Sequence, residues 1–130
     1  MGMRYRLSCS KCNYKKEFDL GSGLGSINLY RNLRLFSEEE QKAILFLKEQ
    51  KRIGFFQIVS RLSWCEHCEE LLEKAFLEME GNDEKRYIFG NYCNICGNEL
   101  KAYEKSEIEQ IFCPECGEIK LDIKEIGYWD

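Results

Sequence analysis

Cys93-Asn94-Ile95-Cys96-Gly97 and, 16 residues further on, Cys113-Pro114-Glu115-Cys116-Gly117 repeat the pattern C-x-x-C-G. Two thiolates three residues apart on a tight turn can face one metal ion, and four thiolates from two such turns complete a tetrahedral shell. Glycine after the second cysteine adopts a left-handed conformation without strain. These two stretches therefore predict a four-cysteine metal site and a C-terminal zinc ribbon over residues 85–130.

Two further C-x-x-C pairs account for the other cysteines, so none of the 8 is left over. A disulfide framework would follow a secretory signal, but residues 1–7 have no apolar signal core. Pairing neighbours in chain order predicts one site from Cys9, Cys12, Cys65 and Cys68, and a second from Cys93, Cys96, Cys113 and Cys116. The alternative is cross-braced and joins 9/12 to 93/96 and 65/68 to 113/116.

The expected cofactors are two structural Zn²⁺ ions. Iron is the alternative at the C-terminal site, because it also accepts a tetrahedral shell of four thiolates. His67 is the only histidine and lies inside a C-x-x-C loop. We expect it to point outward, since four cysteines fill each shell. A catalytic zinc keeps an open position, so we expect no enzyme activity.

The segment before the second cysteine pair predicts a helical insert. Ser37-Glu38-Glu39-Glu40 is a capping box, with Ser at the N-cap and Glu three residues later. The helix is expected over about residues 38–51. Gly21–Ser26 lacks the Lys of a phosphate-binding loop and predicts a turning loop instead.

Strands are expected around each cysteine pair. Near the N-terminus and before Cys65, they are predicted over 4–8, 15–20 and 55–64. The spacing of apolar residues over 71–80 is compatible with a helix, but Gly81-Asn82-Asp83 has turn composition, so we favour a hairpin over 71–92. In the C-terminal ribbon we expect strands over 100–103 and 108–112, a polar tip over 104–107, and a further strand over 119–124.

The fold class predicted from these elements is a small, β-rich α+β protein with two zinc ribbons, the first split by the inserted helix. Residues 1–84 form the first domain and residues 85–130 the second. No stretch is long and apolar enough to span a bilayer, so we expect a cytoplasmic protein without membrane contact.

Charge is distributed unevenly over a chain of net charge -4. Residues 1–61 hold 12 basic and 6 acidic residues, whereas residues 62–130 hold 7 basic and 17 acidic residues. This distribution disfavours nucleic acid wrapped along the whole protein. A local site for phosphates and stacked bases is still possible at the basic and aromatic residues near the first cysteine pair, which are Arg4, Arg6, Lys11, Tyr14, Lys15 and Lys16.

The order and spacing of these features resemble those of uncharacterised zinc-ribbon proteins of Gram-positive bacteria. The shared features are Cys9-x-x-Cys12 followed by Tyr14, a Gly-rich turn, a helix, three more C-x-x-C pairs and a terminal Trp129-Asp130. The resemblance implies zinc binding by the eight cysteines and no activity beyond that. The Cys113–Gly117 stretch is also similar to the knuckle of rubredoxins.

The predicted function is that of a non-catalytic zinc protein that interacts with another macromolecule. We expect a protein partner or self-association, and no small-molecule substrate. Nucleic-acid binding through the basic residues near Cys9 and Cys12 is one alternative. A rubredoxin-like electron carrier, with iron in the C-terminal site, is another.

Overall fold

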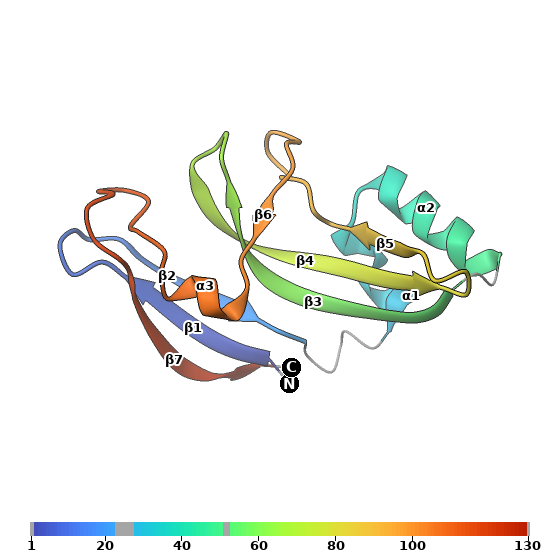
Figure 1. Cartoon of the computed structure of the whole chain (residues 1–130), viewed down its shortest axis with the longest axis horizontal. Coiled ribbons are helices and arrows are strands. Elements are labelled where there is room, and N and C mark those ends of the chain that lie inside the picture. Colours follow the sequence, from blue (N-terminus) through green and yellow to red (C-terminus); the bar gives the residue numbers. More distant parts are fainter. Residues whose placement is uncertain (1, 23–27, 51–52, 130) are drawn as a thin grey trace.

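The computed structural model describes residues 2–22, 28–50 and 53–129. Two antiparallel sheets and a few short helices make a small, β-rich α+β fold, as the sequence predicts. The sheets occupy opposite ends of an elongated molecule, and the first and last strands lie side by side (Figure 1). Most of the predicted Gly-rich loop and the last residue of the predicted helix, Lys51, lie outside the described residues.

The first sheet has three strands in the order β2-β1-β7. They are β1 (Gly2–Ser8), β2 (Lys15–Leu20) and β7 (Asp122–Trp129). β1 lies in the centre and pairs antiparallel with both neighbours, so that Leu7 lies between Lys16 and Ile123. The two ends of the chain therefore share one sheet, and the sheets do not follow the expected division into residues 1–84 and 85–130.

The second sheet has four strands in the order β5-β4-β3-β6. They are β3 (Ile53–Cys65), β4 (Glu70–Gly81), β5 (Arg86–Phe89) and β6 (Lys101–Ala102). Residues 71–80 belong to β4, and residues 77–80 pair with β5 across the turn at 82–85. The hairpin predicted over 71–92 is confirmed, because β4 pairs antiparallel with β5.

Helices flank the second sheet at one end. They are α1 (Leu29–Asn32), the 3-10 turn η2 (Leu33–Leu35) and α2 (Glu38–Glu49). The capping box at Ser37 and Glu40 is formed as predicted. Helix α2 buries Ile44 and Leu47 against Ile58 and Leu77 of the sheet, so it covers this core. Along the chain the helices lie between the first cysteine pair and the later ones, as predicted for an inserted helix.

The segment between Cys96 and Cys113 differs from its prediction. In place of a strand over 108–112, the chain forms a short helix, α3 (Lys105–Ile108), with Glu104 and Glu107 as its capping box. Ile108 and Ile111 are both buried and three residues apart, which suits one face of a helical turn. The segment therefore connects the two sheets and does not double back as a hairpin.

A shared apolar core holds the two sheets together. Leu7 and Phe18 of the first sheet contact Leu62 and Leu71 of the second, and Ile108 of α3 closes the same cluster. The sheets are also joined through the backbone, where Gly21 and Ser60 exchange two hydrogen bonds of 2.8 Å. No helix within the described ranges has the length and apolar character of a membrane span.

Candidate metal centres

The eight cysteines form two groups of four, and the grouping is nested rather than sequential. Cys9 and Cys12 meet Cys113 and Cys116, while Cys65 and Cys68 meet Cys93 and Cys96. Both the chain-order pairing and the cross-braced alternative are therefore wrong. We call the first group the outer centre and the second the inner centre, because the segment that carries the second lies inside the first along the chain.

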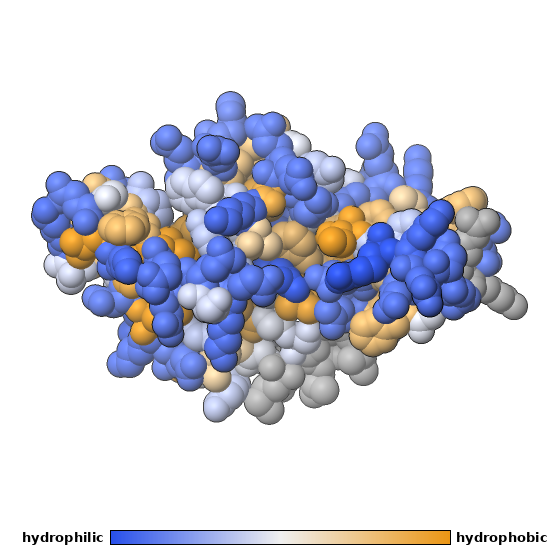
Figure 2. All heavy atoms as spheres, in the orientation of Figure 1, coloured by the Kyte–Doolittle hydropathy of each residue, from blue (hydrophilic) through white to orange (hydrophobic). Residues whose placement is uncertain are grey.

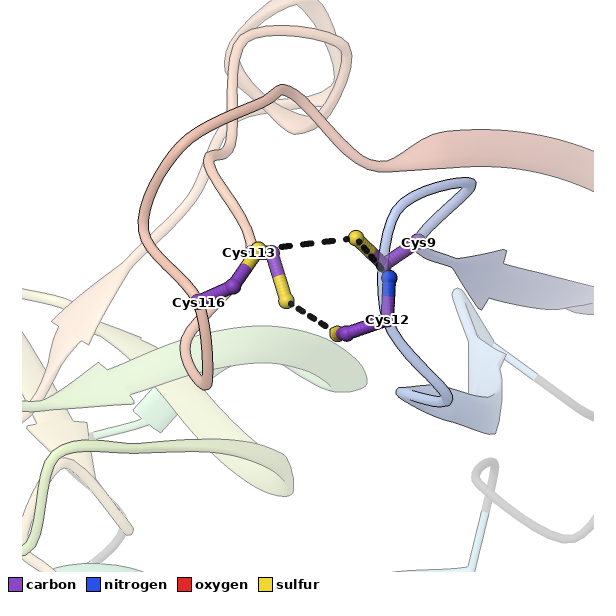
Figure 3. Close-up of side chains that lie close together, drawn as sticks. All are labelled: Cys9, Cys12, Cys113 and Cys116. Carbon is purple, nitrogen blue, oxygen red and sulfur yellow. Dashed lines mark hydrogen bonds between the residues drawn. The ribbon is translucent and has the colours of Figure 1, made fainter.

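The outer centre lies at the end of the three-stranded sheet. The loop from β1 to β2 presents Cys9 and Cys12, and the loop before β7 presents Cys113 and Cys116 from the opposite side (Figure 3). The Sγ atoms of Cys9 and Cys116 are 3.6 Å apart, and those of Cys12 and Cys113 are 3.5 Å apart. Pairing of β1 with β7 brings these loops together, although they are far apart in sequence.

The inner centre is assembled by local structure. Cys65 is the last residue of β3 and Cys68 lies in the turn to β4, which then runs away from them for 12 residues. The turn at 82–85 and β5 bring the chain back to Cys93. The Sγ distances are 3.4 Å between Cys65 and Cys96 and 4.0 Å between Cys68 and Cys93.

Both groups fit a tetrahedral metal ion with four sulfur ligands. Metal–sulfur bonds of about 2.3 Å give a tetrahedron with edges of about 3.8 Å. The four Sγ–Sγ distances given above, 3.4–4.0 Å, bracket this length, and all four sulfurs of each centre lie within 4.8 Å of one another. The cysteines are free thiols, and a disulfide would need about 2.05 Å. His67 is exposed and belongs to neither group.

Backbone turns shape the knuckles around these sulfurs. Gly97 and Gly117 have φ of +78° and +67°, and their N–H groups donate to the carbonyls of Cys93 and Cys113. The residue after Cys68 also takes a positive φ, 54°, although it is Glu69. Asn13, the residue after Cys12, does not have a positive φ.

Hydrogen bonds favour the thiolate form of one cysteine in each centre. Burial opposes ionisation of Cys9, but the N–H groups of Cys12 and Lys11 donate to its Sγ and lower its pKa to about 7. A backbone hydrogen bond from Tyr14 favours the thiolate of Cys12. Burial and the neighbouring thiols nevertheless raise the pKa of Cys12 to about 12.

The inner centre repeats this contrast. A backbone hydrogen bond from Cys96 is the main reason that the pKa of Cys93 falls to about 7, whereas burial raises the pKa of Cys68 to about 12. Such opposite shifts are expected when several thiols share one small volume, since like charges disfavour a second ionisation. A divalent cation supplies the charge that lets four thiolates coexist.

The basic residues near the outer centre are largely paired with carboxylates. Arg4 contacts Asp19 at 2.6 Å, Arg6 contacts Glu17 at 3.0 Å, and Lys11 forms an ion pair with Glu118. Lys16 donates to the carbonyl of Leu71. Lys15 is exposed.

Tyr14, expected to stack on a base, packs partly buried against the core. Burial is also the main reason that its pKa rises to about 12. The candidate nucleic-acid residues thus lie near one another, but the structure does not present them as a free cationic and aromatic surface.

A buried lysine beside the inner centre was not singled out from the sequence. Lys74 is 8% exposed, and its Nζ donates to Oδ1 of Asn94 at 2.8 Å. Asn94 lies within the Cys93–Cys96 knuckle. Burial lowers the pKa of Lys74, while the charges of Glu40 and Cys93 oppose the shift. Lys74 lies within a strand, and no local sequence pattern indicates that it contacts the Cys93–Cys96 knuckle.

Comparisons of this chain with protein-family models, with curated proteins and with solved structures find no match.

Proposed function

We propose that both centres hold structural Zn²⁺ and that the protein is a non-catalytic interaction module. The observation that carries this proposal is the closed sulfur environment, in which four cysteines from two knuckles surround each position. Four thiolates complete the usual shell of a structural zinc and leave no position for a substrate or a reactive water. The role left for such a protein is to present a surface that the metal ions stabilise.

The charge pairing supports a protein partner over nucleic acid. Binding of nucleic acid draws on cations that are free to neutralise phosphates, but Arg4, Arg6 and Lys11 already face carboxylates. Moreover, Zn²⁺ with four thiolates retains a net charge of about -2, so two filled centres make the molecule more acidic. The resemblance to zinc-ribbon proteins of Gram-positive bacteria agrees with this proposal. That the chain belongs to this group is itself a prediction.

Metal analysis of protein purified without added metal tests the proposal. We expect two zinc ions per chain, a colourless solution, and loss of cooperative unfolding after removal of the metal with a chelator, since structural zinc contributes to folding. One metal ion per chain would indicate a protein with a single metal site. Red protein whose iron accepts and donates electrons reversibly would favour the electron-carrier alternative.

A further inference from the structure

The two centres differ in the side chains that support their sulfurs. In the inner centre, Nδ2 of Asn98 donates to Sγ of Cys96 at 3.4 Å. The buried Lys74 holds Asn94 of the same knuckle. In the outer centre, backbone N–H groups donate to Cys9, and among the described residues no side chain other than a cysteine donates to a sulfur. Outer contacts of this kind raise the affinity of a site for its metal, so the inner centre is the better supported of the two.

The two centres also close very different lengths of chain. Cys68 and Cys93 of the inner centre are 25 positions apart, and the β4–β5 hairpin already joins them. Cys12 and Cys113 of the outer centre are 101 positions apart, and the entropic cost of loop closure grows with length. These two knuckles meet through the pairing of β1 with β7. The outer metal and this pairing therefore hold each other in place, without support from a local hairpin.

Strand β7 buries little apolar surface of its own. It is an edge strand that pairs with β1, and none of its residues is buried. Figure 2 shows mostly hydrophilic side chains on the lower left of the molecule, where β7 lies in Figure 1. By contrast, β3 and β4, which meet at the inner centre, bury Leu62, Leu71 and Leu77. Because apolar burial is the dominant favourable term in folding, β7 depends on being fastened at its ends.

Both ends of β7 are fastened. Just before the strand, Cys113 of the outer centre and Leu121 are buried. At its other end, the indole N–H of Trp129 donates to the carbonyl of Leu20 on β2 at 2.9 Å. The same indole lies against Gly2, where a Cβ would overlap it. The outer centre is the fastening that metal occupancy can undo, because its four cysteines are free thiols that a shared metal ion holds as one unit.

We propose that the outer centre is the exchangeable metal site of the protein and acts as a latch for β7. When its metal is lost, β7 separates from β1 and leaves backbone N–H and C=O groups along one edge of β1 unpaired, as at any open sheet edge. The inner centre keeps its metal, and the four-stranded sheet stays folded. The protein then has a second folded form with one metal ion and an open edge. The inference rests on the proposed function, because it requires a metal ion in both centres.

Stepwise removal of zinc from the isotope-labelled full chain with a chelator, followed by NMR and hydrogen exchange, tests the latch. The amides of Gly97 and Gly117 report on the inner and outer centres, because each donates to the carbonyl of the first cysteine of its knuckle. We expect the Gly117 signal to change with the first zinc ion and the Gly97 signal with the second. In the first step, exchange of the Trp129 indole and of the β7 amides should accelerate by about tenfold or more, as expected for local opening. Exchange of the β3 and β4 amides should stay slow until the second step.

Two matched asparagine variants test why the outer centre opens first. Asn98→Ala removes the side-chain donor to Cys96 and should weaken zinc binding at the inner centre by about tenfold, so that the two zinc ions leave closer together. Asn13→Ala is the control, because Asn13 is an exposed residue beside the outer knuckle and is not among the residues that donate to its sulfurs. It should leave the order and the spacing of the two steps unchanged. An unchanged second step in Asn98→Ala would contradict the supporting role of this contact.

Three results of the chelator titration would overturn the latch. They are loss of the inner zinc ion first, loss of both zinc ions in one step, and loss of the outer zinc ion while the Trp129 indole stays protected from exchange. The zinc content before the titration separates this failure from a failure of the proposed function. Two zinc ions at the start, followed by any of these results, reject only the latch. Fewer than two at the start reject the metal assignment itself.

Discussion

Individual residues differ in how well their roles can be predicted from the sequence. The eight cysteines are recognisable because a metal knuckle needs thiolates at a fixed spacing. Lys74 and Gly90 give no such signal, because their importance comes from neighbours that are distant in sequence. Asn94 lies 20 residues from Lys74, and Ala75 lies 15 residues from Gly90. Contacts of this kind become visible only when the strand register is known.

Lys74→Met should weaken zinc binding at the inner centre and leave the outer centre unchanged. The lysine is the buried cation that holds Asn94 of the Cys93–Cys96 knuckle, and loss of such a supporting contact typically reduces metal affinity by about 10–100-fold. Competition with a chromophoric chelator measures the two zinc ions in succession. Lys85→Met is the control, because Lys85 is exposed. Equal changes at both centres would contradict the assignment.

Gly90→Ala should destabilise the protein by more than about 2 kcal/mol. Gly90 has φ of +87°, and a Cβ there would lie 2.2 Å from the carbonyl oxygen of Ala75, so the two strands would have to separate. Gly127→Ala is the matched control, since a Cβ at that position meets nothing within 4 Å. Denaturant unfolding of the zinc-loaded variants gives the difference. Similar stability for both variants would show that the backbone at Gly90 yields easily.

Secondary-structure elements follow the sequence where their determinants are local. The capping box of α2 lies within four residues, Ser37 to Glu40, and was correctly predicted. The 104–112 segment contains a second box of related form, Glu104 with Glu107, but Glu is not the residue usually expected at an N-cap. The expectation of a hairpin between Cys96 and Cys113 also favoured strands there. The helix forms because it buries Ile108 against the shared core.

Removal of the α2 cap should have a small, local effect. Ser37→Ala deletes the hydroxyl that accepts from the N–H of Glu40 at 3.2 Å, and such a loss costs about 1 kcal/mol. The midpoint of chemical unfolding is expected to shift accordingly, without loss of zinc. Ser106→Ala is the control, because Ser106 is an exposed serine of α3. A shift of the same size in this control would assign the effect to serine substitution in general.

The molecule as a whole is organised by a topology that cysteine spacing alone does not determine. Pairing in chain order assumed that the shortest gap, 16 residues, closes a site. The hairpin predicted over 71–92 was the better guide, because a hairpin returns the chain to its starting end and so places Cys93 beside Cys68. Pairing of β7 with β1 was not predictable from local patterns, since the two strands come from opposite ends of the chain.

A fragment over residues 28–103 should fold and bind one zinc ion. It contains all four cysteines of the inner centre, together with the core between α2 and the four-stranded sheet. Residues 85–130 alone should bind no metal in an ordered site, because their two knuckles belong to different centres. Zinc content and amide dispersion in NMR spectra check both fragments. Ordered zinc in the 85–130 fragment would be incompatible with nested centres.

The nested grouping can be tested by counting zinc ions in two double variants of the full chain. Cys12, Cys68 and Cys116 are the partly exposed members of their pairs, so serine can replace them with little disturbance of the core. Cys12→Ser with Cys116→Ser should retain one zinc ion, because both changes fall in the outer centre. Cys12→Ser with Cys68→Ser should retain none, because each centre loses a ligand. One zinc ion in the second variant and none in the first would show that the centres form in chain order, and would contradict the nested architecture.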